Sequence, residues 1–234
     1  MNQTILLVGG TRGTGLLIAQ LLPGMGHRVR ALARNPVRAA ARLGSAVEVI
    51  AGDVTKADTL PPAVRGATHI IFTAGVRSGR LARETLVKAT EYQGVLNTLA
   101  TARTARFGGR FLYMTSLGVT TPSLSAALLN FLKGNTLAWR RRAEAEIRAS
   151  GLDYTIIRAG FLLNRPGGRR AVEVSQRALP LAPRYRIARA DVAAAFVEAL
   201  EHPRASRATF EVVWGRGHRR EDWNALLGRL KPDA

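Results

Sequence analysis

The sequence predicts an α/β fold in which helices cover both faces of a doubly wound parallel sheet. Short apolar runs recur along the chain, as at Thr4 to Val8 and Thr68 to Thr73, and stretches with helical periodicity separate them. The first run enters a glycine-rich turn and then a helix pattern. Since 47% of the 234 residues are hydrophobic and no change of composition marks a boundary, we expect one domain over residues 1–234.

The turn after the first expected strand is typical of a phosphate site. It reads Gly-Gly-Thr-Arg-Gly-Thr-Gly, and the apolar run Leu16 to Leu22 follows it. Glycine allows the tight reversal and lets backbone N–H groups approach a phosphate, while the next helix points its positive end at a pyrophosphate. A glycine turn without a ligand is the alternative. The residues predicted to bind a dinucleotide are Gly9, Thr11, Arg12, Gly13, Thr14 and Gly15.

The end of the second expected strand, His27 to Ala33, bears on the choice of dinucleotide. An acidic residue there would accept hydrogen bonds from the ribose hydroxyls, but no Asp or Glu lies between Gly15 and Glu48. Arg34 stands at that position, and arginine can pair with a 2′-phosphate. Arg34, with Arg12, therefore indicates NADP(H). The alternative is that both are surface arginines in an arginine-rich chain.

Two more expected strands, Val47 to Ile50 and Thr68 to Thr73, are each followed by a motif. The residues read Gly52-Asp53-Val54, then Leu60 and Ala63-x-x-Gly66, and then Thr73-Ala74-Gly75. Together these motifs resemble the atypical, NmrA-like branch of the short-chain dehydrogenase/reductase superfamily. The resemblance covers nearly the whole chain and implies a Rossmann-type fold with a small C-terminal substrate cap within about 161–190 and 202–234.

The same resemblance implies roles for the residues of these motifs. Asp53 would bind the adenine amino group with help from Val54, although a turn or helix-capping role is the alternative for this carboxylate. The residues implied along the ribose and pyrophosphate are Thr73, Ala74 and Gly75.

A long helix pattern over 80–105 and a fifth strand, Arg110 to Thr115, lead to the sheet edge at which open parallel sheets bind ligands. The resemblance implies that Ser116 lies there beside the nicotinamide and orients the substrate. A hydroxyl that caps the end of the strand is the alternative for Ser116.

The Tyr-x-x-x-Lys pair of better known family members is missing from the sequence. Tyr154-x-x-x-Arg158 has the spacing but falls in an expected strand, Tyr154 to Ile157, where these positions share no helical turn. By the register of the resemblance, the family lysine falls on Arg140 and the tyrosine on Thr136, with Arg141 or Arg142 as alternatives one turn away. Arginine stays charged and cannot carry the proton, but it can hold ribose hydroxyls or an anionic substrate.

The C-terminal part completes the expected fold. The resemblance implies that Asp191 caps a helix reaching Leu200 and pairs with Arg189. A strand over Thr209 to Val213 and a helix over Asp222 to Leu230 follow. The residues implied along the substrate pocket are Phe161, Leu162, Asn164 and Arg165.

The charge and composition of the chain limit which partners it can have. The net charge is +19, but the cations are spread along the chain without aromatic interleaving or a helix-turn-helix pattern, so nucleic acid is disfavoured and an anionic cofactor or substrate is favoured. The absence of cysteine excludes disulfides and thiolate chemistry, and we expect no metal. No apolar stretch is long enough to span a bilayer, so we expect a cytoplasmic protein with no membrane partner. The oligomeric state is open.

These observations favour an NADPH-dependent oxidoreductase that passes hydride to a small conjugated or carbonyl acceptor, such as a flavin or quinone. Ser116 would orient the acceptor, and Arg140 would hold the ribose or an acidic group of the substrate. The alternative is a non-catalytic NADP(H)-binding sensor or scaffold of the NmrA type, because some relatives bind the dinucleotide and perform no chemistry.

Overall fold

The computed structural model describes residues 3–76, 81–217 and 222–233, and within them an eight-stranded sheet dominates. The strand order is β3-β2-β1-β4-β5-β6-β10-β8, and only β8 runs antiparallel to its neighbour. A separate parallel pair joins β7 and β9. The strands are β1 (Thr4–Val8), β2 (Arg28–Ala33), β3 (Val47–Ala51), β4 (His69–Phe72), β5 (Arg110–Ser116), β6 (Asp153–Ala159), β7 (Phe161–Leu163), β8 (Val172–Ser175), β9 (Arg186–Ala188) and β10 (Ala208–Trp214).

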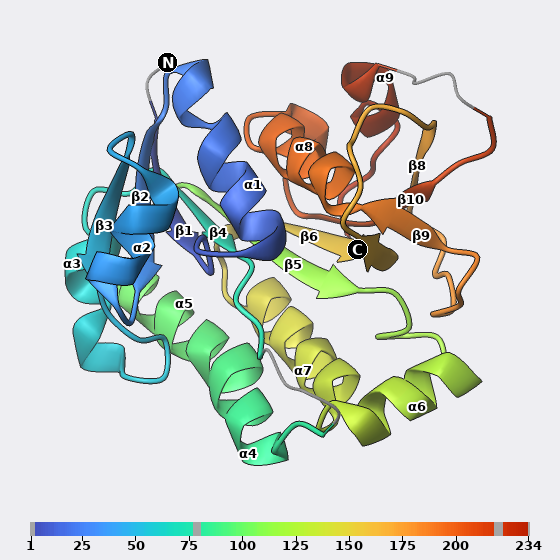
Figure 1. The fold of residues 1–234 in the computed structure, drawn as a ribbon, viewed down its shortest axis with the longest axis horizontal. Helices are drawn as coiled ribbons and strands as arrows, with labels where there is room; N and C mark the ends of the chain where they lie inside the picture. Colours follow the sequence, from blue (N-terminus) through green and yellow to red (C-terminus); the bar gives the residue numbers. More distant parts are fainter. Residues whose placement is uncertain (1–2, 77–80, 218–221, 234) are drawn as a thin grey trace.

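Helices cover both faces of the sheet, which confirms the doubly wound prediction (Figure 1). One layer contains α1 (Gly13–Leu21), α2 (Pro36–Leu43), α8 (Arg189–Ala199) and α9 (Trp223–Leu227). The other contains α3 (Pro61–Val64), α4 (Glu84–Val87), α5 (Gly94–Thr104), α6 (Leu124–Leu132) and α7 (Thr136–Ala149). Short 3-10 turns lie at Pro23–Met25, Ala57–Thr59 and Pro203–Ala205. No helix in the described parts of the chain is long and apolar enough to cross a membrane.

The helix expected over 80–105 is interrupted. Residue 80 lies outside the described residues, α4 begins at Glu84, and a π-helical stretch, η3 (Lys88–Gln93), joins α4 to α5. One wide turn of this kind shifts the register of the side chains, and π turns occur frequently at functional sites. The π-helical stretch carries Glu91, which is buried.

The expectation for Asp191 is wrong in both parts. Its carboxylate accepts hydrogen bonds from the Gly168 N–H (2.7 Å) and from the Trp214 indole (2.8 Å), and α8 begins after Ala188 without a side-chain cap. Arg189 instead donates to Asn164 (2.9 Å). Asp191 thus fastens the loop after β7 and the end of β10 to α8.

A buried ionic cluster lies between α7 and strands β6 and β10. Arg158 donates to Glu144 (2.6 Å) and lies 3.7 Å from Glu211. Burial raises the pKa of Glu211 to about 7, although the backbone N–H of Leu179 and the positive charge of Arg158 act in the opposite direction. Glu211 therefore keeps its proton in the fold at a pH where the unfolded chain has released it.

This difference predicts how stability depends on pH. Because the folded-state pKa is raised from 4.5 to about 7, the free energy of unfolding should fall as pH rises through this window. The loss should be about 2 to 3 kcal/mol. Denaturant unfolding at pH 5 and pH 8 should show that Glu211→Gln flattens this slope.

The matched control is Glu173→Gln, which changes an exposed carboxylate on the neighbouring strand β8. This variant should keep the slope of the original chain. An unchanged slope in Glu211→Gln would contradict the assignment of the titration to Glu211.

Candidate active site

A cavity of about 1270 Å³ opens at the carboxyl edge of the parallel strands. It lies where the strand order reverses between β1 and β4, which is the position at which open α/β sheets bind ligands. Every residue expected to hold the dinucleotide lines it. These are Gly9, Thr11, Arg12, Gly13, Thr14, Gly15, Arg34, Asp53, Val54, Thr73, Ala74 and Gly75. The structure thus brings together residues from four separate turns, and their binding roles remain predictions.

The glycine turn packs backbone against backbone. Gly9 has a φ of +92°, and a Cβ there would lie 2.6 Å from the Ala74 nitrogen. A Cβ on Gly15 would collide with the Gly9 carbonyl and the Thr73 hydroxyl. The turn after β1 and the end of β4 can therefore touch only because these positions carry no side chain. This contact leaves the first N–H groups of α1 at the cavity.

The charge of the cavity is strongly positive. Of the described residues that line it, six are arginines and Asp53 alone is a carboxylate. Guanidinium groups form bidentate, charge-assisted hydrogen bonds with phosphates. The cavity is thus suited to a ligand with several phosphate groups. The arginines are Arg12, Arg34, Arg38, Arg42, Arg140 and Arg189.

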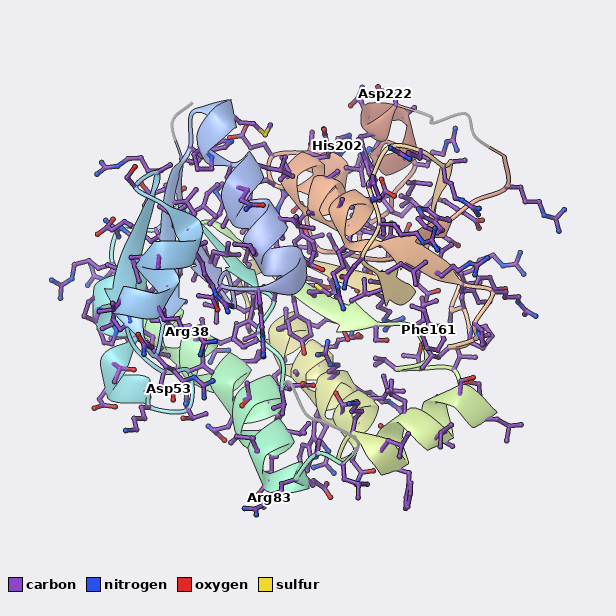
Figure 2. The ribbon with its side chains drawn as sticks, in the orientation of Figure 1. Arg38, Asp53, Arg83, Phe161, His202 and Asp222 are labelled. Atoms are coloured by element: carbon purple, nitrogen blue, oxygen red, sulfur yellow. The ribbon has the colours of Figure 1, made fainter. Side chains whose placement is uncertain are left out.

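Arg38 and Arg42 were missed by sequence reasoning. They stand one turn apart on α2, where Asn35 caps the helix by accepting from the Arg38 N–H (2.9 Å). The start signal Asn35-Pro36 together with the four-residue spacing could have placed both on the face next to Arg34. Figure 2 shows Arg38 on the same side of the molecule as Asp53, the other lining residue that it labels.

Asp53 and Val54 are held in place by their own hydrogen bonds. One carboxylate oxygen of Asp53 accepts from the backbone and the hydroxyl of Thr55 (3.0 and 2.9 Å), so the turn role considered for this residue is present in the structure. Asn97 on α5 donates to the Val54 carbonyl (2.8 Å). The loop after β3 is therefore fixed from both ends beside the cavity.

Arg140 is the member of the basic run on α7 that faces the cavity. Its guanidinium donates to Glu91 (2.8 Å) and to the Met114 carbonyl on β5 (3.1 Å). Arg141 is exposed, and Arg142 lies over the Trp139 ring at 4.7 Å. The sequence spacing did not decide which of the three arginines faces the cavity, and the structure shows that it is Arg140.

Glu91 is the main functional candidate that the sequence did not reveal. It lies in the π turn η3, is buried, and accepts from the Val76 N–H (2.9 Å), the Thr136 hydroxyl and Arg140. Burial alone would lower the pKa of Arg140, but the Glu91 carboxylate more than offsets this and the pKa is raised. Arg140 is therefore a permanent cation in a fixed position. A single glutamate in a helical stretch gives no sequence signal for this contact.

The expected substrate residues divide into two groups. Leu162 and Asn164 line the cavity, whereas Phe161 and Arg165 do not. Figure 2 shows Phe161 well apart from Arg38 and Asp53. Ser116 is also outside the lining, although Met114, two residues earlier and on the same face of β5, is part of it. Ser116 is thus close to the lining along β5 without being part of it.

The comparisons with known proteins agree with this geometry. A family model described as NAD(P)H-binding matches residues 9–203. Sanguinarine reductase of Eschscholzia californica is 30% identical over 268 residues, which covers 97% of this chain and 96% of the relative.

Two solved structures are similar in fold. ChuY, an anaerobillin reductase of Escherichia coli O157:H7, has a TM-score of 0.72 at 26% identity, covering 92% of this chain and 99% of that one. A short-chain dehydrogenase/reductase of Veillonella parvula in complex with NADP has a TM-score of 0.72 at 18% identity, covering 94% and 98%.

The Glu91–Arg140 pair gives a stability prediction. Glu91→Gln should lower the free energy of unfolding by about 2 to 4 kcal/mol, because it leaves a mostly buried guanidinium without its counter-charge. Glu48→Gln is the control, since it breaks an exposed pair with Arg30 and should cost less than about 1 kcal/mol. Urea unfolding of both variants measures the difference, and equal losses would show that Arg140 does not depend on Glu91.

Proposed function

This chain belongs to the NAD(P)H-binding family, and on that premise we propose that it is an NADPH-dependent reductase. Its acceptor would be a small molecule with a conjugated system or a carbonyl group, such as a flavin or quinone. The observation that carries the proposal is the arginine-lined cavity at the switch point of the sheet. The names of two relatives, sanguinarine reductase and an anaerobillin reductase, support a reductase.

The preference for the phosphorylated dinucleotide rests on Arg34, Arg38 and Arg42. They line one end of the cavity, next to the end of β2, where this class of fold places the adenosine ribose. A 2′-phosphate would meet three cations there, and no acidic residue among the described lining residues of β2 and α2 would repel it. The pyrophosphate would meet the N–H groups at the start of α1.

The bound dinucleotide would supply the hydride, and the protein would supply orientation and electrostatics. Arg140 would hold a ribose hydroxyl or an anionic group of the acceptor, while Ser116 would orient the acceptor. Within the described lining there is no histidine, tyrosine, lysine or cysteine. The proton would therefore come from solvent, because arginine keeps its proton at any working pH.

The non-catalytic sensor or scaffold is the second candidate. Thr136 favours this candidate, because it stands at the position that the resemblance gives to the family tyrosine, and its hydroxyl donates a hydrogen bond to Glu91. It is disfavoured by the relatives that are named reductases. A sensor would distinguish NADPH from NADP⁺ in affinity and would show no turnover with any acceptor.

The cofactor preference can be measured by calorimetric titration with NADPH and NADH. Arg34→Ala should weaken NADPH binding about tenfold, because one charge-assisted contact is lost, and should leave NADH binding within about twofold. Arg28→Ala, at the opposite end of the same strand and exposed, is the matched control and should change neither. Equal weakening of both dinucleotides by Arg34→Ala would contradict the 2′-phosphate assignment.

Activity is tested by following NADPH oxidation with a panel of flavins, quinones and linear tetrapyrroles. At least one acceptor should be reduced above the rate without enzyme. Ser116→Ala should then lower the rate about 10- to 100-fold while NADPH affinity stays the same, because the serine would contact only the acceptor. Tight NADPH binding without turnover on any acceptor would favour the sensor instead.

A further inference from the structure

The helix α6 carries an apolar stripe on its solvent-facing side. Leu124, Leu128 and Phe131 are 92%, 59% and 77% exposed, and their spacing places them on one face of the helix. Leu81, which is 70% exposed, lies beside the end of this helix, since the next residue, Ala82, donates to the Leu132 carbonyl (3.1 Å). We call these four side chains the α6 face. Figure 1 shows α6 at the edge of the molecule, outside α7.

The other side of α6 already has its packing partners. Ala126 is buried in a small core with Leu117, Val119 and Leu181, and Leu129 packs against it. Ser123 caps the helix and also donates to the Leu181 carbonyl (2.9 Å). The outward apolar stripe therefore contributes nothing to these contacts. A contiguous exposed apolar stripe of this kind marks an interaction surface.

The charges around the α6 face are nearly all positive. Lys133 follows the helix directly, and Arg83 follows Leu81 by two residues. Glu84 is an exception, because it lies against Gly134 just after the end of the helix and accepts from the Trp139 indole (3.0 Å). No Asp or Glu occurs between residues 119 and 142. The surface is thus apolar in its centre and mainly basic at its rim.

We propose that the α6 face docks the protein on an anionic lipid bilayer. Leucine and phenylalanine side chains would enter the boundary between headgroups and acyl chains, and the basic rim would meet lipid phosphates. A second copy of this chain fits less well, because it would bring two basic rims together in a protein of net charge +19.

Docking of this kind lies in the plane of the interface and needs no spanning helix. The proposal therefore replaces the expectation of no membrane partner, and it does not depend on the proposed reductase activity.

The lack of native cysteines allows a single-site test of insertion. Phe131→Cys and Met25→Cys would each carry an environment-sensitive nitrobenzoxadiazole label, Met25 being an exposed apolar residue near the end of α1. With vesicles of phosphatidylcholine and 30% phosphatidylglycerol, the label at position 131 should gain fluorescence at least about threefold, and the label at position 25 should stay constant. Equal signals at the two sites would overturn the proposal.

Co-sedimentation with the same vesicles distinguishes binding through the apolar stripe from binding through the net charge of the protein. Leu128→Glu/Phe131→Glu should reduce binding about tenfold or more relative to Leu21→Glu/Met25→Glu, which makes the same charge change on exposed residues elsewhere. Binding only through the net charge would weaken equally in both variants and would overturn the proposal. The proposal would also be overturned if light scattering showed that Leu128→Glu/Phe131→Glu alone converts a dimer to a monomer. NADPH titration of all variants checks that the fold is intact.

Discussion

The arrangement of the site depends on one backbone contact, where the turn after β1 meets the end of β4. Gly9 lies against Ala74 so closely that a Cβ on the glycine would fall 2.6 Å from the neighbouring nitrogen. This contact lies at the switch point of the sheet, and the start of α1 lines the cavity beside it. The loops after the other parallel strands reach the same sheet edge, because parallel strands bring their carboxyl ends together, and helices α2, α7 and α8 add Arg38, Arg140 and Arg189.

The cavity concentrates cations, and the fold holds several of them with hydrogen-bond acceptors rather than with carboxylates. Arg12 donates to the Gly75 carbonyl (2.6 Å), and Arg189 donates to Asn164 (2.9 Å). Arg140, which is mostly buried, pairs with the Glu91 carboxylate. The position of the charge on Arg140 is therefore fixed by Glu91.

The fold and the cofactor end of the site could be predicted because their signals are local. Apolar runs, glycine spacing and the strand-end motifs that carry the resemblance each span a few residues, and the twelve residues they pointed to line the cavity, while their binding roles remain predictions. Glu91 and the true partners of Asp191 could not be predicted, since these contacts join residues far apart in the sequence. Helix α6 was missed because its apolar residues face solvent as well as core, which blurs the helical pattern.

In the proposed reductase, Arg140 stands at the position that the resemblance gives to the family lysine, and this would change what the site can control. A lysine–tyrosine pair ties proton delivery to a pKa that the protein tunes, whereas a guanidinium held by Glu91 offers only charge. If hydride transfer occurs here, the fixed cation would stabilise negative charge that develops on the acceptor, and protonation would follow from water. Such an arrangement suits conjugated acceptors, because their delocalised anions are stable enough to be protonated by water in a later step. A simple ketone would need the proton during hydride transfer, so we propose a conjugated acceptor before a simple carbonyl compound.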